Sequence, residues 1–294
     1  MPSARRLAAA GCLLAAAALP LAARAAKLPR PDHVLIVIEE NKSFDQIIAK
    51  NPMVKTAAPY INALAARGAL FTDSHALVHP SEPNYLALFS GSTHGVRDDR
   101  CPLALSGPNL ATALRGRGFS FATYSESMPA RGFKGCFADH YLYARKHNPA
   151  ANWSGLPDSV NLRFEDFPRD FARLPTVALV IPNQLNDMHN GRSPESIRRG
   201  DAWLESRIGP YIRWARSHNS LFILTWDEDD FSSDNHIATL LVGPMVRPGR
   251  YGGRIDHYRV LRTLTDMYGL PPLGEAAQSA PITGIWRCGD RGGN

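Results

Sequence analysis

The chain has 294 residues, 44% of them hydrophobic, and a formal net charge of +6 with neutral histidines. This length and apolar content suffice for one large domain with a well-buried core. Because Arg5, Arg6 and Arg24 lie in an N-terminal segment, the rest of the chain carries about +3, which is weak support for an anionic ligand. The sequence has no basic stripe interleaved with aromatic residues, so nucleic-acid binding is not expected.

The N-terminus has the pattern of an export signal. Arg5 and Arg6 precede an apolar run over residues 7–21, and Ala23-Arg24-Ala25 has the A-x-A form of a cleavage site. The run is too short for a stable membrane anchor. We therefore expect residues 1–25 to be a signal peptide and residues 26–294 to form a single domain in the periplasm or outside the cell.

The first predicted strand ends in oxygen donors. Residues 33–38 form a β-branched apolar run, typical of a buried parallel strand, and they lead into Glu39, Glu40 and Asn41. In open α/β sheets, ligands bind at the carboxyl ends of the strands. Surface turns also favour Asp and Asn, so this cluster alone is compatible with an ordinary turn.

A second predicted strand leads into a helix that begins near Ser81. Residues 71–78 have strand character, Pro83 suits the first turn of a helix, and Gly91 suits its end. Backbone N–H groups and the helix dipole favour an anion at this end. Ser81 can cap the helix, or it can attack a phosphate held there if a metal lowers its pKa. The acidic strand ends elsewhere in the chain favour the nucleophile.

Helical patterns alternate with apolar strands along the chain, which predicts an α/β fold with a mostly parallel sheet between helices. The helical patterns cover residues 57–67, 109–117 and 195–217, and further apolar runs cover 176–182, 220–226 and 237–242. Residues 127–170 are rich in Pro, Asn and Gly, and we expect them to cross the sheet edge and to line part of a substrate pocket.

Cysteine usage agrees with export. Removal of the signal peptide, with its Cys12, leaves Cys101, Cys136 and Cys288. An oxidising compartment favours one disulfide. We expect Cys101–Cys136, and a pairing that involves Cys288 stays open.

Acidic residues also follow the apolar run 220–226, where Asp227 and Glu228 come directly after Trp226. Two strands that end in oxygen donors suggest one cation held between them. Carboxylate, amide and hydroxyl oxygens without a thiolate suit hard cations such as Ca²⁺, Mg²⁺ or Mn²⁺.

Five short blocks together resemble the signature of a known family. In chain order they are Glu40-Asn41, His79-Pro80-Ser81-Glu82-Pro83-Asn84-Tyr85, Asn186-Asp187-Met188-His189, Trp226-Asp227-Glu228 and His257-Tyr258. This order resembles the phosphoesterase family of acid phosphatases and bacterial phospholipases C, within the alkaline phosphatase superfamily, over residues 31–274.

The resemblance implies an alkaline-phosphatase-like fold, a serine nucleophile and a metal ion. The implied metal ligands are Glu40, Asn41, Ser81, Asp227 and Glu228, with Ser81 as the nucleophile. Some relatives carry an Asp pair where this chain has Asp227-Glu228, so the longer Glu departs from their pattern. Zn²⁺ and iron also occur in the superfamily, so they stay open beside Ca²⁺, Mg²⁺ and Mn²⁺. Sulfatases of the superfamily have Arg at the position of Tyr85, which argues against a sulfatase.

The histidines allow two interpretations. In two-metal members of the superfamily, an Asp and a His from the region of Asp187 and His189 join a late His, here His257, to hold a second cation. Alternatively, Asp187, His189 and His257 bind phosphoryl oxygens and protonate the leaving group without a metal. The short spacing between Asp187 and His189 favours the metal-free role. Four further residues are candidates for substrate binding, namely His79, Asn84, His147 and Asn183.

We therefore expect an exported, metal-dependent phosphoester hydrolase that acts on a small phosphorylated substrate or a lipid headgroup. An acid phosphatase for phosphomonoesters is favoured over a phospholipase C-type phosphodiesterase, because the sequence shows no amphipathic, Trp- or Leu-rich stretch for lipid docking. An inactive secreted binding protein with the same fold is the alternative from another class. The intact candidates in every block argue against it.

Overall fold

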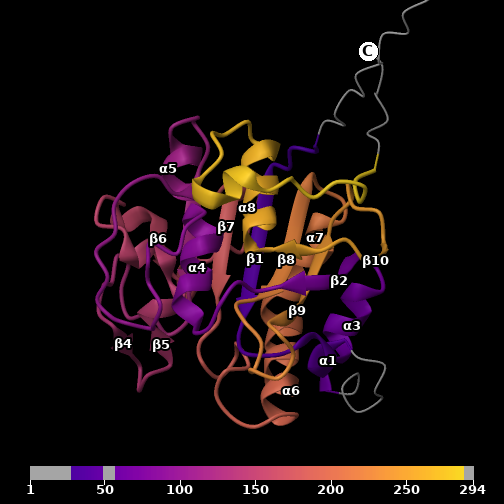
Figure 1. Cartoon of the computed structure of the whole chain (residues 1–294), viewed down its shortest axis with the longest axis horizontal. Coiled ribbons are helices and arrows are strands. Elements are labelled where there is room, and N and C mark those ends of the chain that lie inside the picture. The colour runs from indigo at the N-terminus through magenta and orange to yellow at the C-terminus, as the bar shows by residue number, and fades with distance from the viewer. Residues whose placement is uncertain (1–27, 49–56, 288–294) are drawn as a thin grey trace, which may run out of the picture.

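The computed structural model describes residues 28–48 and 57–287, so the predicted signal peptide, Cys12 and Cys288 lie outside the described residues. A nine-stranded mixed sheet forms the centre of the described chain (Figure 1). Its strands lie in the order β10-β2-β9-β8-β1-β7-β3-β6, and β11 pairs with β2. The bounds are β1 His33–Glu39, β2 Ala69–His75, β3 Phe121–Ser125, β6 Asn161–Arg163, β7 Val177–Ile181, β8 Ser220–Trp226, β9 His236–Val242, β10 Gly249–Tyr251 and β11 Ile255–Asp256.

The sheet is mostly parallel, as predicted. Strand β1 lies at its centre and pairs in parallel with β7 and β8, and β3 pairs in parallel with β7 and β6. Strand β9 is antiparallel to both β8 and β2. The parallel strands β1, β7 and β8 are buried along nearly their whole lengths, which explains their continuous apolar sequences.

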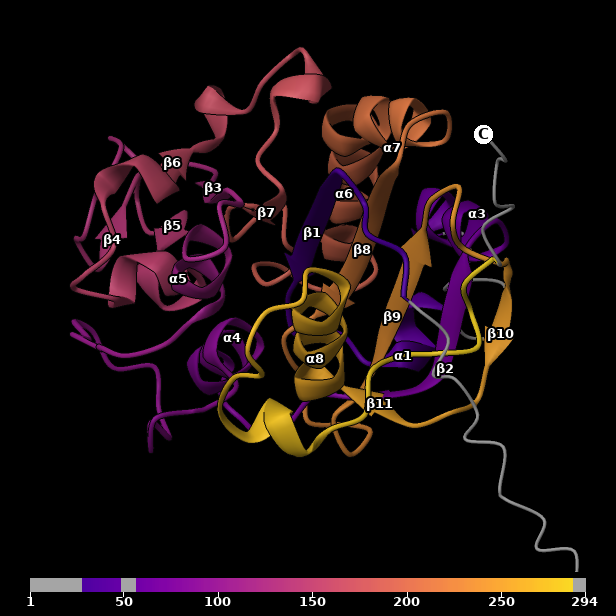
Figure 2. The same cartoon turned by 90° about the horizontal axis from the view of Figure 1, so that it is seen from above.

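Helices cover both faces of the sheet (Figure 2). One layer holds α4 Ser81–Ser90, α5 Leu110–Arg115 and α8 His257–Met267, and the other holds α1 Phe44–Ile47, α3 Pro59–Ala65, α6 Glu195–Trp203 and α7 Gly209–Ala215. Alternate residues of β1 contact opposite layers, because strand side chains alternate between faces. Val34 and Ile36 pack with the α4 layer, and Leu35 and Val37 pack with the α6 layer.

The structure changes some predicted bounds. The predicted helices 57–67 and 109–117 are the shorter α3 and α5. The pattern over 195–217 divides into α6, a π-helical turn at Leu204–Ile208, and α7. The strand predicted over 71–78 is β2, which begins and ends earlier and runs antiparallel to β9. A 3₁₀ turn at Phe171–Arg173 precedes β7, and another at Gly274–Gln278 follows α8.

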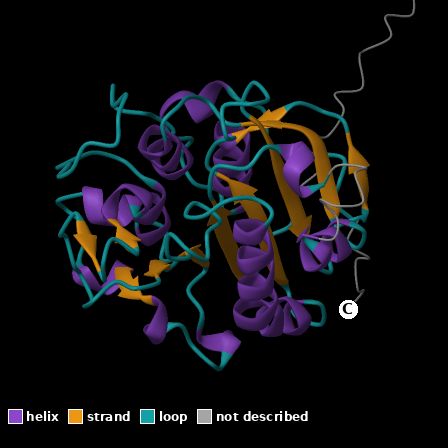
Figure 3. Cartoon of the chain, turned by 90° about the horizontal axis from the view of Figure 1, so that it is seen from below, coloured by secondary structure: helices purple, strands orange, loops and turns teal. Residues whose placement is uncertain are grey.

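The irregular region 127–170 lies at the β6 edge of the sheet, as predicted, and forms short elements (Figure 3). They are the hairpin of β4 Phe137–Ala138 and β5 Tyr143–Ala144, β6, and 3₁₀ turns at Arg145–His147, Pro149–Asn152, Asp158–Val160 and Phe164–Asp166. The predicted disulfide between Cys101 and Cys136 is present and joins this region to the loop after α4. Among the described helices, none has the length and apolarity needed to cross a membrane.

Candidate active site

Ser81 is the first residue of α4, at the carboxyl edge of the sheet. The ten-residue helix is buried throughout and ends before Gly91, whose φ of +75° forms the left-handed cap. A Cβ at Gly91 would lie 2.2 Å from the backbone oxygen of Leu273, so the turn also needs glycine for space. The N-cap residue is Pro80, and the Ser81 hydroxyl donates to Glu40 Oε2 at 3.2 Å. The hydroxyl is therefore directed at a carboxylate and does not cap the helix.

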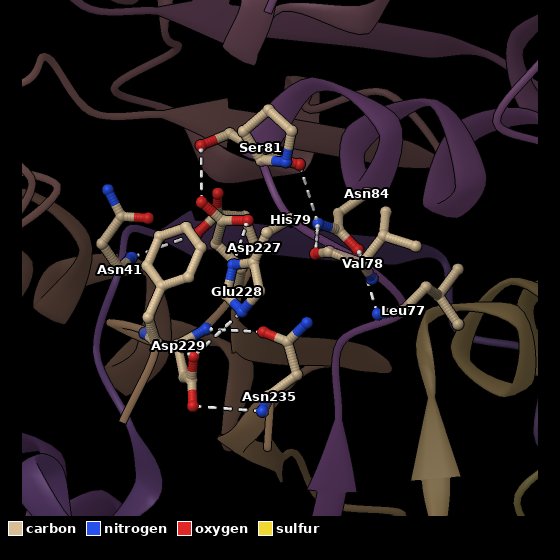
Figure 4. Close-up of polar contacts among 12 residues, drawn as sticks. Asn41, Leu77, Val78, His79, Ser81, Asn84, Asp227, Glu228, Asp229 and Asn235 are labelled. Carbon is tan, nitrogen blue, oxygen red and sulfur yellow. Dashed lines mark hydrogen bonds and ion pairs between the residues drawn. The ribbon is translucent and has the colours of Figure 1, made fainter. Parts of the chain in front are cut away.

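The two acidic strand ends meet around Ser81 because β1 and β8 run side by side. Their register pairs Glu39 with Trp226, so Glu40 and Asp227 follow at the same level. The backbone N–H of Asp227 donates to Glu39 O at 3.0 Å, and that of Asn41 donates to Asp227 Oδ1 at 3.1 Å. Figure 4 shows Asn41, Asp227 and Glu228 on the side of the site that Ser81 faces.

Glu228 is the second carboxylate within reach of the serine. Its Oε1 lies 3.4 Å from Ser81 Oγ, and its Oε2 lies 2.8 Å from His79 Nδ1. The other ring nitrogen of His79 lies 3.2 Å from Asp229 Oδ1. His79, a predicted substrate-binding residue, thus contacts Glu228 and the loop that follows Glu228. Through Glu228 it lies near Ser81.

Glu40 also contacts a second group of side chains through its other oxygen. Oε1 accepts a hydrogen bond from the Tyr85 hydroxyl and lies 3.3 Å from His147 Nε2. His147 Nδ1 lies 3.7 Å from Asp187 Oδ2, and the Tyr85 ring stacks on His147 with centroids 5.2 Å apart. Glu40, His147 and Asp187 each offer one ligand atom, all within 4.8 Å of one another.

Four carboxylates are buried in this small volume: those of Glu40, Asp187, Asp227 and Glu228. Burial, followed by repulsion from Asp187, raises the pKa of Glu40 well above its usual value. Burial and the neighbouring Asp227 raise the pKa of Glu228 to about 9. Without a bound cation, ionisation of these buried carboxylates therefore costs free energy. A bound cation would remove that cost.

Unpartnered donor atoms provide a second test of whether a metal fits. Asn41 Oδ1, Asp187 Oδ2 and Asp227 Oδ2 are buried and have no hydrogen-bond partner among the described residues. Buried oxygens in native proteins are nearly always paired. Unpaired oxygens beside clustered carboxylates are the donor set that a hard divalent cation requires. The residues present therefore fit a metal ion.

The three residues predicted to act together as a second site, Asp187, His189 and His257, each make a defined contact. His257, the first residue of α8, has its Nε2 2.8 Å from the backbone oxygen of Asp227, so Nε2 carries the hydrogen. His189 pairs through Nδ1 with Asn190 Oδ1 at 2.9 Å, and its backbone N–H donates to Asp187 Oδ1 at 2.8 Å. The group with Asp187 and Glu40 that the structure assembles contains His147, which sequence reasoning placed among the substrate-binding candidates.

Two predicted substrate-binding residues, Asn84 and Asn183, make hydrogen bonds that hold loops. Asn84 Oδ1 accepts from the backbone N–H groups of Leu77 and Val78, and its Nδ2 donates to Val78 O and Pro80 O. These contacts brace the turn that leads to Ser81 (Figure 4). Asn183 Oδ1 similarly accepts two backbone N–H groups, and its Nδ2 donates to Ser127 Oγ. These contacts use most of the hydrogen-bonding groups of the two amides, and their role in substrate binding stays a prediction.

Sequence reasoning did not single out Lys146, a cation whose charge acts on Glu40. Its Nζ lies 2.7 Å from Asp99 Oδ2, and Asp99 Oδ1 accepts the backbone N–H of Glu82, the residue after Ser81, at 3.0 Å. Burial opposes the charge of Lys146, but Glu40 and Asp99 outweigh it and raise the pKa of the amine. Its place directly before the candidate His147 was the only signal in the sequence.

Comparison with known proteins shows the family of this chain. The model of the Phosphoesterase family matches residues 54–271. The chain belongs to the Phosphoesterase family. As a member it is a hydrolase that acts on phosphoric ester bonds, as the sequence resemblance predicted.

The relatives of this phosphoesterase include phosphatases from bacteria and fungi. It is 47% identical over 267 residues to a phosphatidylinositol-3-phosphatase from Mycobacterium tuberculosis, covering 89% of this chain and 85% of the relative. It is 33% identical to an acid phosphatase from Aspergillus fumigatus, covering 77% of this chain but 52% of that protein. A solved alkaline phosphatase superfamily protein from Vibrio parahaemolyticus has a similar fold, with a TM-score of 0.61 and 12% identity. The match covers 87% of this chain and 71% of that protein.

Proposed function

We propose that the chain is an exported, divalent-metal-dependent phosphomonoester hydrolase with Ser81 as its nucleophile. The observation that carries this proposal is the direction of the Ser81 hydroxyl. It lies at a helix N-terminus, where backbone N–H groups favour an anion, yet it donates to the buried carboxylate of Glu40. A serine that only capped the helix would bond to the helix backbone.

The proposed metal ligands are Glu40, Asn41, Ser81, Asp227 and Glu228. When bound, a divalent cation supplies charge for the phosphoryl oxygens and lowers the pKa of a coordinated hydroxyl. Ca²⁺, Mg²⁺ and Mn²⁺ suit the oxygen donors, and Zn²⁺ or iron would be favoured if His147 takes part through the Glu40 and Asp187 group. The identity and number of ions are outcomes of metal analysis.

The chain's own residues then account for the two chemical steps. Ser81 Oγ gives its proton to Glu40 or Glu228 and forms a bond to phosphorus, while the bond from phosphorus to the leaving oxygen breaks. We assign the proton for the leaving oxygen to His189, whose Nε2 is not the nitrogen paired with Asn190. Lys146 and the α4 N-terminus stabilise the phosphoryl charge. Water then cleaves the phosphoserine, which releases phosphate and restores Ser81.

The names of the relatives support phosphomonoesters as substrates over phosphodiesters, and the disulfide supports export from the cytoplasm. The named relatives are an acid phosphatase and a phosphatidylinositol-3-phosphatase, and both names describe monoester hydrolysis. A lipid headgroup monoester therefore stays a candidate substrate beside small phosphorylated molecules. The disulfide between Cys101 and Cys136 favours an oxidising compartment, which agrees with the predicted signal peptide.

The test compares substrates and metal states of the purified protein. We expect release of phosphate from nitrophenyl phosphate, loss of activity after chelation, and recovery when a divalent metal is restored. Rapid quenching with labelled substrate should place the label on Ser81. Faster hydrolysis of bis-nitrophenyl phosphate or phosphatidylcholine than of monoesters would support the phospholipase C-type alternative. Activity that survives complete removal of metal would contradict the proposed cofactor.

A further inference from the structure

A pocket of about 330 Å³ has in its wall His79, which lies two residues before the proposed nucleophile in the chain. His79 forms part of its wall and links it to Ser81 through Glu228, which contacts both side chains. Figure 4 shows Asp229 and Asn235 on one side of Glu228, with Ser81 on the other. A leaving group bonded to a phosphoryl group at Ser81 therefore has this pocket within reach.

An exposed aromatic ring forms one side of the pocket. Phe231 is 75% exposed, although large apolar side chains are usually buried. One face of its ring stacks on His79, with centroids 3.8 Å apart and planes 19° apart. The opposite face is open for a ligand.

The loop that carries Phe231 is held rigidly. The buried carboxylate of Asp229 accepts the backbone N–H groups of Phe231, Ser233 and Asn235 at 2.7, 2.8 and 3.1 Å. Asn235 Oδ1 in turn accepts the Asp229 N–H at 3.0 Å. Phe231 has a φ of +65°, a left-handed conformation that is unfavourable for a residue with a β-carbon and persists only where the surroundings hold it. A loop over-determined in this way presents its aromatic ring in one position.

The polar groups of the pocket suit hydroxyls and an anion. Asp234 supplies a carboxylate, and Asn235 supplies an amide nitrogen, because its oxygen is used by Asp229. Arg254 lines the same pocket with a side chain 66% exposed, and its ion pair with Asp73 is long, at 3.9 Å. A guanidinium held so loosely can pair with a phosphate in the fork geometry that it prefers.

We propose that this pocket, the ring pocket, binds the leaving group of the substrate, and that this group is a cyclic polyol carrying a second phosphate. The C–H face of the polyol packs on Phe231, Asp234 and Asn235 bind its hydroxyls, and Arg254 binds the second phosphate. This inference rests on the proposed function. A purely apolar leaving group would make no use of Asp234 and Arg254, and a simple alkyl phosphate would not fill the pocket.

The test measures kcat/KM by phosphate release from three soluble substrates: dibutanoyl phosphatidylinositol 3-phosphate, inositol 3-phosphate and propyl phosphate. Phe231→Ala should lower kcat/KM about tenfold for both ring substrates and leave propyl phosphate unchanged. Phe231→Trp should retain most activity. Arg254→Gln should lower kcat/KM about fivefold for the lipid headgroup, which carries a second phosphate, and not for inositol 3-phosphate.

Matched controls separate ligand binding from general damage. Phe137→Ala removes another exposed phenylalanine, on β4, and Arg117→Gln removes an exposed arginine after α5. Both should behave like the parent on all three substrates. Equal losses on propyl phosphate and the ring substrates would overturn the inference, since Phe231 would then only shape the site. A Phe231→Ala defect larger for adenosine monophosphate than for the inositols would assign the pocket to a nucleoside. If the parent hydrolyses none of these esters, the proposed function itself fails.

Discussion

Ser81 and Tyr85 contact the two oxygens of one carboxylate, that of Glu40. Ser81 lies 3.2 Å from Oε2, and the Tyr85 hydroxyl donates to Oε1. Because the two residues are four positions apart, they lie on the same face of α4. One helix thus supplies both the proposed nucleophile, Ser81, and the hydroxyl of Tyr85 that orients Glu40. Glu40 in turn contacts His147.

The first prediction concerns the nucleophile. Ser81→Ala should reduce turnover by about three orders of magnitude or more, because the residue that forms the phosphoenzyme is lost. The matched control is Ser90→Ala at the other end of α4, where the hydroxyl bonds to Leu86 O. Circular dichroism should show both variants folded. Near-parent turnover in Ser81→Ala would return this residue to a structural role.

Removal of metal ligands forms the second prediction. Glu40→Gln and Asp227→Asn should each lower bound metal and activity together, since both carboxylates surround the same proposed ion. The double variant should lose little more than either single variant. Metal analysis by mass spectrometry gives the readout, with exposed Asp98→Asn as the control. Full occupancy in both single variants would show that the two strand ends do not share an ion.

Tyr85→Phe tests how Glu40 is oriented. The substitution keeps the ring that stacks on His147 but removes the hydroxyl that donates to Glu40. We expect metal affinity or kcat to fall about 10- to 100-fold, the size typical of residues that orient a ligand. The measurement is a metal titration of activity. Parent-like affinity and kcat together would mean that Glu40 is positioned without this bond.

The fourth prediction separates the two roles of the histidines. If His189 protonates the leaving group, His189→Gln should slow poor leaving groups strongly and nitrophenol little, with metal content unchanged. If His189 and His257 instead hold a second cation, His189→Gln and the matching His257→Gln should each lose about one ion per chain. Hydrolysis should then slow equally for all leaving groups. Metal stoichiometry beside rates on alkyl and nitrophenyl phosphates decides. Parent-like rates on an alkyl phosphate in both variants would exclude both roles.

Stability should depend on the protonation of Glu82. Burial and the neighbouring Asp99 raise the pKa of this carboxyl from 4.5 to about 8 in the folded protein. Between these pH values unfolding releases a proton, so the stability gained from the protonated group is present at low pH and is lost as pH rises. Glu82→Gln removes this group and should flatten the pH dependence by roughly 2–4 kcal/mol between pH 5 and 8.5.

Urea unfolding of the parent and of Glu82→Gln at several pH values measures this difference. Glu165→Gln, an exposed acid, is the control and should follow the parent. Identical pH slopes in the parent and Glu82→Gln would show that the Glu82 carboxyl is ionised in the folded state at neutral pH.

Local sequence determined the elements and most of the residues at their ends. The runs before Glu40 and Asp227 are apolar at consecutive positions, which indicates burial on both faces of a sheet. They therefore predicted β1 and β8. Pro83, whose φ is restricted to helical values, and Gly91, which can adopt the left-handed cap, predicted α4 and the place of Ser81. These signals need only neighbours in sequence, which is why the sequence alone contained them.

Tertiary structure decided which of these residues meet. The register of β1 on β8 brings Glu40 and Asp227 to one level, and no local pattern encodes a register between strands this distant in sequence. His147 joins Glu40 because an irregular region folds back over α4, whereas His257 turns to the backbone of Asp227. The sequence around Phe231 predicts only a loop. Its ring belongs to a pocket only because buried Asp229 fixes that loop against His79, a long-range contact that propensity and spacing do not specify.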